Sequence, residues 1–219
     1  PSVRTESRFC SGSARKESWD RRGLALVYCE PPSGVAVSLR GAHVTARPVF
    51  YGAVPVAWIG AGLTQDPSAV AAAYRLTLSQ GLTYGLVVGM KHAVGRPRPY
   101  VNLSLDARAD RHRPPPSGDA YLSFPSGHAS LSTALATSWS LSHPRWYVIA
   151  PGALWAAGVT LSRLYLGVHY PSDVLVGAAI GAGMAVLVHQ VRAIVTPPPF
   201  RASGPQLVRT PPITIRLRF

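Results

Sequence analysis

The sequence predicts an all-α protein that forms a multi-spanning transmembrane helix bundle. Charged residues make up 14% of the 219 residues, whereas typical soluble domains contain roughly 25%. Hydrophobic residues account for 47% of the chain, and the mean hydropathy is slightly positive. Five apolar segments follow one another between residues 48 and 188. Few charges and repeated apolar segments are together typical of a protein that crosses a membrane several times.

These apolar segments are the helices that we expect. They run about 48–65, 69–90, 129–142, 146–162 and 174–188. A spanning helix needs about 20 apolar residues. The first two segments are long enough, the fourth is borderline, and the third and fifth need their polar ends. A soluble bundle of buried helices is the alternative.

Residues inside the segments favour the membrane. Gly177 and Gly181 form a G-x-x-x-G pattern in the fifth segment, which allows close helix packing in lipid. Aromatic residues that suit a membrane interface lie in or beside the segments. They are Trp58, Trp139, Trp146 and Tyr147.

The polar stretches divide the chain into three parts. Residues 1–44 form a polar or interfacial segment, 45–195 the helical domain, and 196–219 a Pro-rich tail that ends in a possible short strand at 213–219. Within the helical domain, residues 97–124 form a long polar connection, and connections of this length are often functional.

The net charge of +13 comes almost entirely from arginine and is concentrated towards both ends of the chain. A basic balance suits anionic lipid, an anionic substrate or nucleic acid. The chain has no RNP, zinc-finger or helix-turn-helix pattern, so we expect no nucleic-acid partner.

Cys10 and Cys29 are the two cysteines of the chain. They can form a disulfide if the N-terminal segment lies outside the cytoplasm, or they can remain free thiols. Without a CxxC or a Cys/His cluster, no structural zinc site is expected.

Lys91 and Arg98 supply the first pair of anion-binding side chains. They are two helical turns apart and share a face if the helix persists. Pro97 and Pro99 flank Arg98 and are expected to end the helix there. Two cations at a helix end suit an anion, although basic anchors at a membrane interface are the alternative.

The piece Pro125-Ser126-Gly127-His128 stands directly before an apolar segment. Ser126 is a candidate N-cap, and a helix N-terminus with glycine lets phosphate oxygens approach closely. His128 can then give a proton to a leaving oxygen. The alternative is an ordinary capped helix start.

Arg163, His169 and Asp173 form the third piece. At a spacing of four residues, Asp173 can accept a hydrogen bond from one ring nitrogen of His169 and leave the other nitrogen as a nucleophile. Arg163 would add a bidentate phosphate contact. The alternative is a His/Asp helix cap without chemistry.

The three pieces together resemble the PAP2 phosphatase superfamily, the type 2 phosphatidic acid phosphatases. The stretches that carry the resemblance are KHAVGRPRP, FPSGHAS and SRLYLGVHYPSD, and it covers roughly Lys91 to Val188. It implies a bundle of the PAP2/haloperoxidase type. It also implies that His169 is the nucleophile that forms a phosphohistidine, that His128 protonates the leaving group and then activates water, and that Asp173 orients His169.

The resemblance also implies a phosphate-binding set and the absence of a cofactor. The residues that would hold the phosphoryl oxygens are Lys91, Arg98, Ser126, Gly127 and Arg163. No motif residue is substituted, so an active enzyme is expected. Neither a metal nor another cofactor is expected, because the cations would stabilise the transferring phosphoryl group.

The predicted topology places all the motif residues on one side of the membrane. The resemblance implies the extracytoplasmic side of a bacterial inner membrane. The arginines of the tail agree with a cytoplasmic C-terminus, whereas the basic N-terminal cluster does not. The expected partners are membrane lipids and a lipid phosphate or diphosphate substrate, such as undecaprenyl diphosphate or phosphatidylglycerol phosphate. The alternatives are a soluble acid phosphatase, a vanadium-dependent haloperoxidase and a lipid-binding protein without activity.

Overall fold

The computed structural model describes residues 9–10, 18–29, 31–103, 105 and 118–200, and the regular elements in this part of the chain are all helical. The long helices are α2 (Trp19–Tyr28), α3 (Ser33–Thr64), α4 (Pro67–Val94), α6 (Gly127–Ser142), α7 (Trp146–Tyr165) and α8 (Pro171–Gln190). The short ones are α5 (Pro99–Asn102), α9 (Arg192–Val195) and the 3-10 turns η2 (Gly118–Tyr121) and η3 (Pro198–Phe200). The all-α prediction is therefore confirmed. The strand predicted at 213–219, most of the tail and residues 106–117 of the connection lie outside the described residues.

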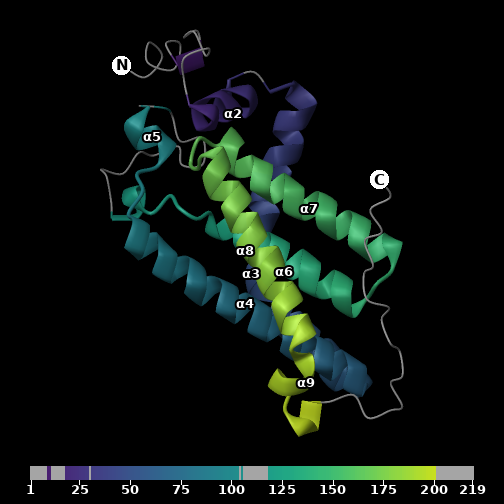
Figure 1. Cartoon of the computed structure of the whole chain (residues 1–219). Helices are drawn as coiled ribbons and strands as arrows, with labels where there is room; N and C mark the ends of the chain where they lie inside the picture. Colours follow the sequence, from purple (N-terminus) through teal and green to yellow (C-terminus); the bar gives the residue numbers. More distant parts are fainter. Residues whose placement is uncertain (1–8, 11–17, 30, 104, 106–117, 201–219) are drawn as a thin grey trace, which may run out of the picture.

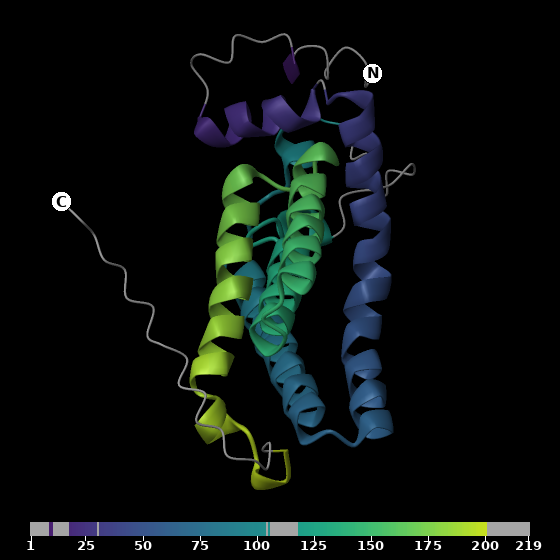
Figure 2. The same ribbon diagram turned by 90° about the vertical axis from the view of Figure 1, so that its right-hand side faces the viewer.

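Helix α6 is the centre of the bundle and packs against α8, α7 and α4, while α3 packs against α7 and α4. Helices α3, α4, α6, α7 and α8 run side by side, and α2 crosses one end of this bundle (Figures 1 and 2). Leu24 and Tyr28 of α2 are fully buried there, against Leu164 of α7 and Val174 of α8. Helix α2 therefore closes the end of the bundle at which α7 finishes and α8 begins.

Gly177 and Gly181 make the close contact between α8 and α6. A Cβ atom at Gly181 would lie 1.9 Å from the carbonyl oxygen of Ser130, and one at Gly177 would lie 2.6 Å from that of Ser126. Thr133 adds a hydrogen bond across the same interface, to the carbonyl oxygen of Ala178 (3.0 Å). The predicted packing role of the G-x-x-x-G pattern is confirmed, because neither position has room for a side chain.

Helix α3 begins much earlier than the sequence pattern predicted. It starts at Ser33 instead of near residue 48, so the expected boundary after residue 44 falls inside one continuous helix and is corrected to Pro32, the N-cap. The apolar run was interrupted by Arg40, His43 and Arg47, but these three lie on one face of the helix. A polar stripe lowers the hydropathy of a segment without ending its helix.

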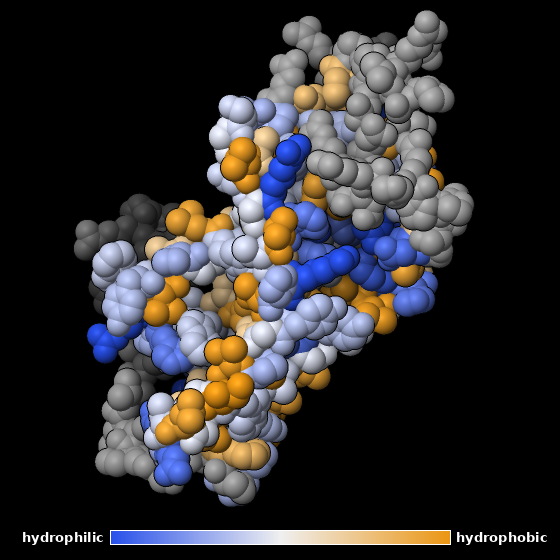
Figure 3. Space-filling model, turned by 180° about the vertical axis from the view of Figure 1, so that it is seen from behind, coloured by the Kyte–Doolittle hydropathy of each residue, from blue (hydrophilic) through white to orange (hydrophobic). Residues whose placement is uncertain are grey.

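By length and hydropathy, α8 is the one described helix that could cross a membrane. The five predicted spans remain a prediction. Large apolar side chains are nevertheless exposed on several helices. They include Val56, Ile59 and Leu63 of α3, Leu82 and Leu86 of α4, Trp146, Ile149 and Leu154 of α7, and Leu175 and Leu187 of α8. Apolar patches extend along the bundle, whereas most of the strongly hydrophilic surface lies towards the α2 end (Figure 3). Such a distribution suits a lipid environment.

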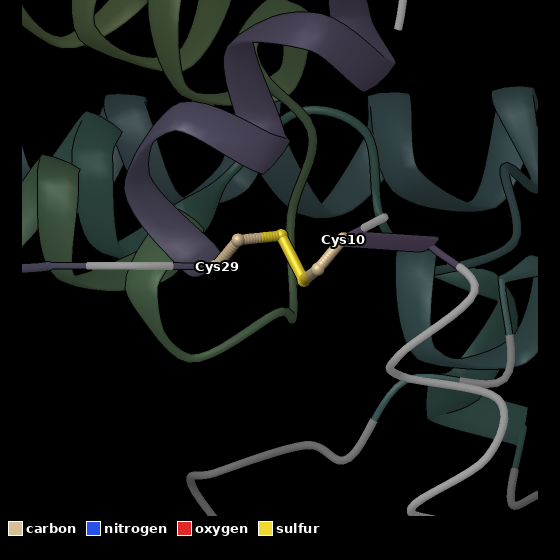
Figure 4. The surroundings of a disulfide bond; sticks show 2 residues. All are labelled: Cys10 and Cys29. Carbon is tan, nitrogen blue, oxygen red and sulfur yellow. A yellow bond between two sulfur atoms is a disulfide. The ribbon is translucent and has the colours of Figure 1, made fainter. Parts of the chain in front are cut away.

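Cys10 and Cys29 are joined by a disulfide, with their Cα atoms 5.6 Å apart (Figure 4). The bond ties Cys10 to the residue that follows α2. The structure therefore contains the disulfide and not the two free thiols.

Candidate active site

The predicted site residues converge at the end of the bundle that α2 covers. A cavity of about 290 Å³ opens there, which is near the lower limit of small-molecule sites, about 300–1,000 Å³. Its lining includes six of the predicted residues: Lys91, Arg98, Gly127, His128, Arg163 and His169. Ser126 and Asp173 are fully buried beside this lining. The ends of α4, α6, α7 and α8 thus bring three separate sequence pieces to one cavity.

His169 is buried, and its Nδ1 atom faces the carboxylate of Asp173. Nδ1 lies 3.6 Å from Asp173 Oδ2, which is within ion-pair range but longer than a hydrogen bond, and 3.4 Å from the hydroxyl of Ser123. The Ser123 hydroxyl donates to the same Asp173 oxygen at 2.6 Å. With Nδ1 turned towards this pair, Nε2 is the ring nitrogen left for a substrate.

Burial lowers the pKa of His169 from its ordinary value of 6.5 to about 4. The positive charges of Arg98 and Lys91 also lower this pKa, whereas Asp173 raises it. At neutral pH the imidazole is therefore uncharged and carries a lone pair. An uncharged ring is the form that can attack a phosphorus atom.

Asp173 is held by more groups than the sequence indicated. The backbone N–H of Tyr170 donates to Oδ2 (2.9 Å), and Arg96 donates to Oδ1 (2.6 Å). Arg96 also donates to Asp20 of α2 (2.8 Å), and Asp20 accepts a bond from the backbone N–H of Ser172 (2.8 Å). The carboxylate that faces His169 is thus fixed on both of its oxygen atoms.

Ser126 is the N-cap residue of α6, but its side chain does not cap the helix. Its backbone N–H donates to the carbonyl oxygen of Asp173 (2.9 Å). Among the described residues, neither Ser126 Oγ nor His128 Nε2 has a hydrogen-bond partner, although both atoms are buried. Unpaired buried polar atoms cost free energy, so these two are suited to a ligand.

Arg163 is 3% exposed, and no carboxylate of a described residue forms an ion pair with it. It donates instead to Ser162 Oγ (2.8 Å) and to Nδ1 of His43. A buried cation without a counter-ion is strongly unfavourable. An anion in the cavity would supply the missing charge.

Lys91 and Arg98 are the two other predicted cations. The ammonium group of Lys91 donates to the carbonyl oxygen of Leu122. Arg98 donates to both carboxylate oxygens of Asp119 (3.2 Å each), and the Asp119 side chain is 70% exposed. Asp119 therefore sits at the solvent side of the cavity.

Sequence reasoning missed several residues of this site. Arg96 lies within the KHAVGRPRP stretch and Ser123 next to FPSGHAS, so their positions beside the motifs were the available signal. They were missed together with Asp20, His43, Arg47 and Asp119. For Asp20 no local signal exists, because it reaches the site only through the packing of α2.

Among the described residues, no group of three His, Cys, Asp or Glu side chains is placed to hold a metal ion. The described lining contains four cations, Arg47, Lys91, Arg98 and Arg163, and one carboxylate, Asp119. Its side chains suit an anion, and metal independence remains a prediction.

Residues 72–196, more than half of the chain, match the PAP2 superfamily. The chain belongs to the PAP2 superfamily. The resemblance drawn from the three motifs is thereby confirmed. His43 and Arg47 of α3, which also line the cavity, lie outside the matched range.

Relatives of this PAP2 chain are named as phosphatases of different lipids. It is 33% identical to the lipid A 1-phosphatase of Rhizobium johnstonii over 136 residues, which cover 62% of the chain and 48% of that protein. It is 34% identical to the decaprenylphosphoryl-5-phosphoribose phosphatase of Mycolicibacterium smegmatis over 144 residues, covering 64% of the chain and 71% of that protein. The chain spans about half the length of the lipid A 1-phosphatases of Rhizobium that it matches.

The fold is also that of solved PAP2 structures. The crystal structure of Aquifex aeolicus LpxE aligns with a TM-score of 0.65 at 22% identity, covering 80% of this chain and 97% of that one. The transmembrane PAP2 type phosphatidylglycerolphosphate phosphatase of Bacillus subtilis aligns with a TM-score of 0.59 at 18% identity, covering 88% and 94%. The predicted fold of the PAP2 type, a bundle shared with transmembrane phosphatases, is confirmed.

Proposed function

We propose that this protein hydrolyses a phosphate or diphosphate group on a membrane lipid through a phosphohistidine at His169. The observation that carries the proposal is the buried guanidinium of Arg163, which has no carboxylate partner among the described residues and shares its cavity with two histidines. A phosphoryl group would supply the missing negative charge. The names of the relatives support the same reaction class.

The residues divide the reaction into two steps. Nε2 of His169 attacks phosphorus, the bond from phosphorus to the leaving oxygen breaks, and that oxygen takes a proton from His128. Burial and the charge of Arg163 lower the pKa of His128 to about 2, so the ring acquires this proton only when the negative phosphoryl group is bound. His128 then takes a proton from water as the water oxygen attacks the phosphohistidine, which releases inorganic phosphate and restores His169. Asp173 acts as a positioning residue for His169.

The cations stabilise the charge that the phosphoryl oxygens carry during transfer. Lys91, Arg98 and Arg163 surround the cavity, and preorganised positive groups in a partly dehydrated site are a large source of rate enhancement. Ser126 Oγ and the backbone N–H of Gly127, at the start of α6, add donors to the same oxygens. No metal is required in this scheme.

We further propose that the protein crosses a bacterial inner membrane several times, with the cavity on the extracytoplasmic side. The exposed apolar side chains of α3, α4, α7 and α8 support insertion in lipid. The disulfide between Cys10 and Cys29 directly follows α2, the helix that covers the end of the bundle that holds the cavity, and disulfides persist in oxidising compartments.

The test is phosphate release by the detergent-purified protein with EDTA present. Undecaprenyl diphosphate, phosphatidylglycerol phosphate and a small aryl phosphate are compared for the wild type, His169→Ala and the control His92→Ala, whose histidine is exposed on α4. We expect release by the wild type and the control and none by His169→Ala. Transfer of labelled phosphate to the wild-type protein, in an acid-labile bond, would support the intermediate.

Three outcomes would contradict the proposal. Release that persists in His169→Ala would exclude this histidine as the nucleophile. Halide oxidation that depends on added vanadate, without phosphate release, would favour a haloperoxidase, and full extraction without detergent would favour a soluble acid phosphatase.

A further inference from the structure

Helix α3 brings two more basic side chains to the cavity. His43 and Arg47 line it together with Arg163, Lys91 and Arg98. Neither belongs to the three motifs, and both precede the part of the chain that matches the PAP2 superfamily. No carboxylate of a described residue forms an ion pair with Arg47. The cavity thus holds more positive charge than the motif residues account for.

The position of α3 is set by several contacts with α7. Arg40 donates to the hydroxyl of Tyr165 (3.1 Å). Trp155 donates from its indole nitrogen to Thr45 Oγ1 (3.1 Å). Gly158 allows α3 and α7 to approach, since a Cβ atom there would lie 3.2 Å from Ala42. Contacts on both sides of residue 43 therefore hold this stretch of α3 in one register.

The ring of His43, which lines the cavity, is oriented by Arg163. Arg163 donates to Nδ1 of His43, and a guanidinium group cannot accept a hydrogen bond. Nδ1 must therefore be the unprotonated nitrogen, which makes Nε2–H the donor of the ring.

The α3 residues lie on the His128 side of the cavity. Phe50 follows Arg47 by one helical turn, and its ring meets the ring of His128 edge-on at 5.6 Å. Burial lowers the pKa of His128, and the charges of Arg163 and Arg47 act in the same direction, whereas Arg98 and Lys91 are the cations that act on the pKa of His169. The cations are thus distributed over two sides, one for each histidine.

The His128 side is the leaving-group side of the proposed reaction. An alcohol leaving group carries no negative charge besides that which its bridging oxygen gains as the bond breaks. A phosphate leaving group carries negative charge before and after the bond breaks, and this charge increases at the bridging oxygen as the bond breaks. Two basic side chains on that side match the second case.

We infer that His43 and Arg47 form a second anion subsite, which binds the phosphate that stays on the lipid, so that the preferred substrate is a lipid diphosphate. The inference rests on the proposed function. His169 Nε2 would bond to the terminal phosphorus, the bridging P–O bond would break, and the bridging oxygen would take a proton from His128. The products would be a lipid monophosphate and, after water attacks the phosphohistidine, inorganic phosphate.

The first experiment compares a prenyl diphosphate with the prenyl monophosphate of the same tail in detergent micelles. We expect the wild type to have the higher kcat/KM for the diphosphate. Arg47→Gln should lower the ratio of the two kcat/KM values about 10- to 100-fold, because it removes a charge-assisted bond to one substrate only, and Arg47→Lys should restore part of the ratio. The control Arg145→Gln changes an exposed arginine at the other end of α7 and should leave the ratio unchanged. An unchanged ratio in Arg47→Gln would overturn the inference.

The second experiment measures binding without turnover. Isothermal titration with methylenediphosphonate and methylphosphonate should show tighter binding of the diphosphonate by the wild type, and this preference should be lost in Arg47→Gln and weakened in His43→Gln. An Arg47-dependent preference without any phosphate release would refute the proposed function and leave the subsite standing. Phosphate release with equal affinity for the two phosphonates would refute the subsite and leave the proposed function standing.

Discussion

The two histidines of the cavity have opposite surroundings. His169 is buried, and the carboxylate that it faces is held by a hydroxyl, a backbone N–H and a guanidinium group. His128 is half-buried, and its Nε2 atom and the neighbouring Ser126 Oγ have no partner among the described residues. One side of the cavity is complete without a ligand, whereas the other leaves polar atoms for a ligand to satisfy.

This difference matches the roles that we propose. A nucleophile must already be oriented when the substrate arrives, since a misplacement of about 1 Å can cost 100-fold in rate. A group that serves the leaving oxygen forms its decisive hydrogen bond only with the substrate, so an unpaired atom is expected there. The start of α8 thus orients the nucleophile, His169, whereas the start of α6 supplies the group that binds the leaving oxygen, His128.

Replacing His128 should have a large effect, and the size of this effect should depend on the leaving group. Without a proton donor, His128→Ala should lower kcat about 10²- to 10⁴-fold on an alkyl phosphate, and much less on an aryl phosphate whose leaving oxygen needs no proton. Stopped-assay phosphate release on both substrates measures the two ratios. Equal losses on both would assign His128 to binding instead of proton transfer.

The Asp173→Asn substitution should act on the other side and should be insensitive to the leaving group. Losing the charge that orients His169 should lower kcat about 10²-fold with little change in KM, because the cations of the cavity remain in place. The measurement is kcat on the same alkyl phosphate and aryl phosphate. If the loss of kcat in Asp173→Asn depended on the leaving group as it does in His128→Ala, the His169 side and the His128 side of the cavity would not have the separate roles that we propose.

Gly177→Ala should disturb the His128 side through the α6–α8 contact. The added Cβ atom would lie 2.6 Å from the carbonyl oxygen of Ser126, so the start of α6 must shift, at a cost of about 1–3 kcal/mol in the free energy of unfolding. We expect a lower melting temperature and a rate loss of roughly 10-fold. Gly183→Ala, on the same helix with nothing within 4 Å of its Cβ position, is the control and should behave like the wild type.

The last expected effect is on the pH dependence of stability and needs no change in the active-site geometry. The folded protein holds the pKa of His169 at about 4, against an ordinary value of 6.5. Between these values the unfolded chain binds a proton that the folded chain does not. The free energy of unfolding should therefore fall as the pH is lowered through this window, by at most about 1.4 kcal/mol per pH unit from this group.

Thermal unfolding in detergent from pH 7 to pH 4 measures this slope. His169→Gln lacks the titrating group and should give a shallower curve than the wild type. Identical slopes would mean that His169 is not held uncharged in the folded state.

Much of the site followed from short sequence pieces. Lys91 and Arg98, Ser126 to His128, and Arg163 to Asp173 each combine a helix end with a polar side chain, and both properties are local. The start of α3 did not follow, because the hydropathy of residues 33–47 averages over a polar face and an apolar face. That these residues belong to the same helix as the apolar segment after them becomes visible only from the helices that pack against α3.

The sequence by itself determined the helical class of this protein and the set of motif side chains available to an anion, because hydropathy, helix termini and side-chain chemistry are properties of neighbouring residues. Only the tertiary structure decided that Asp20 reaches Arg96 and that His43 and Arg47 lie beside His128. Those placements depend on how α2 and α3 pack against α7 and α8. Such packing depends on close contacts between residues far apart in the chain, such as Gly158 against Ala42, and these leave no local pattern.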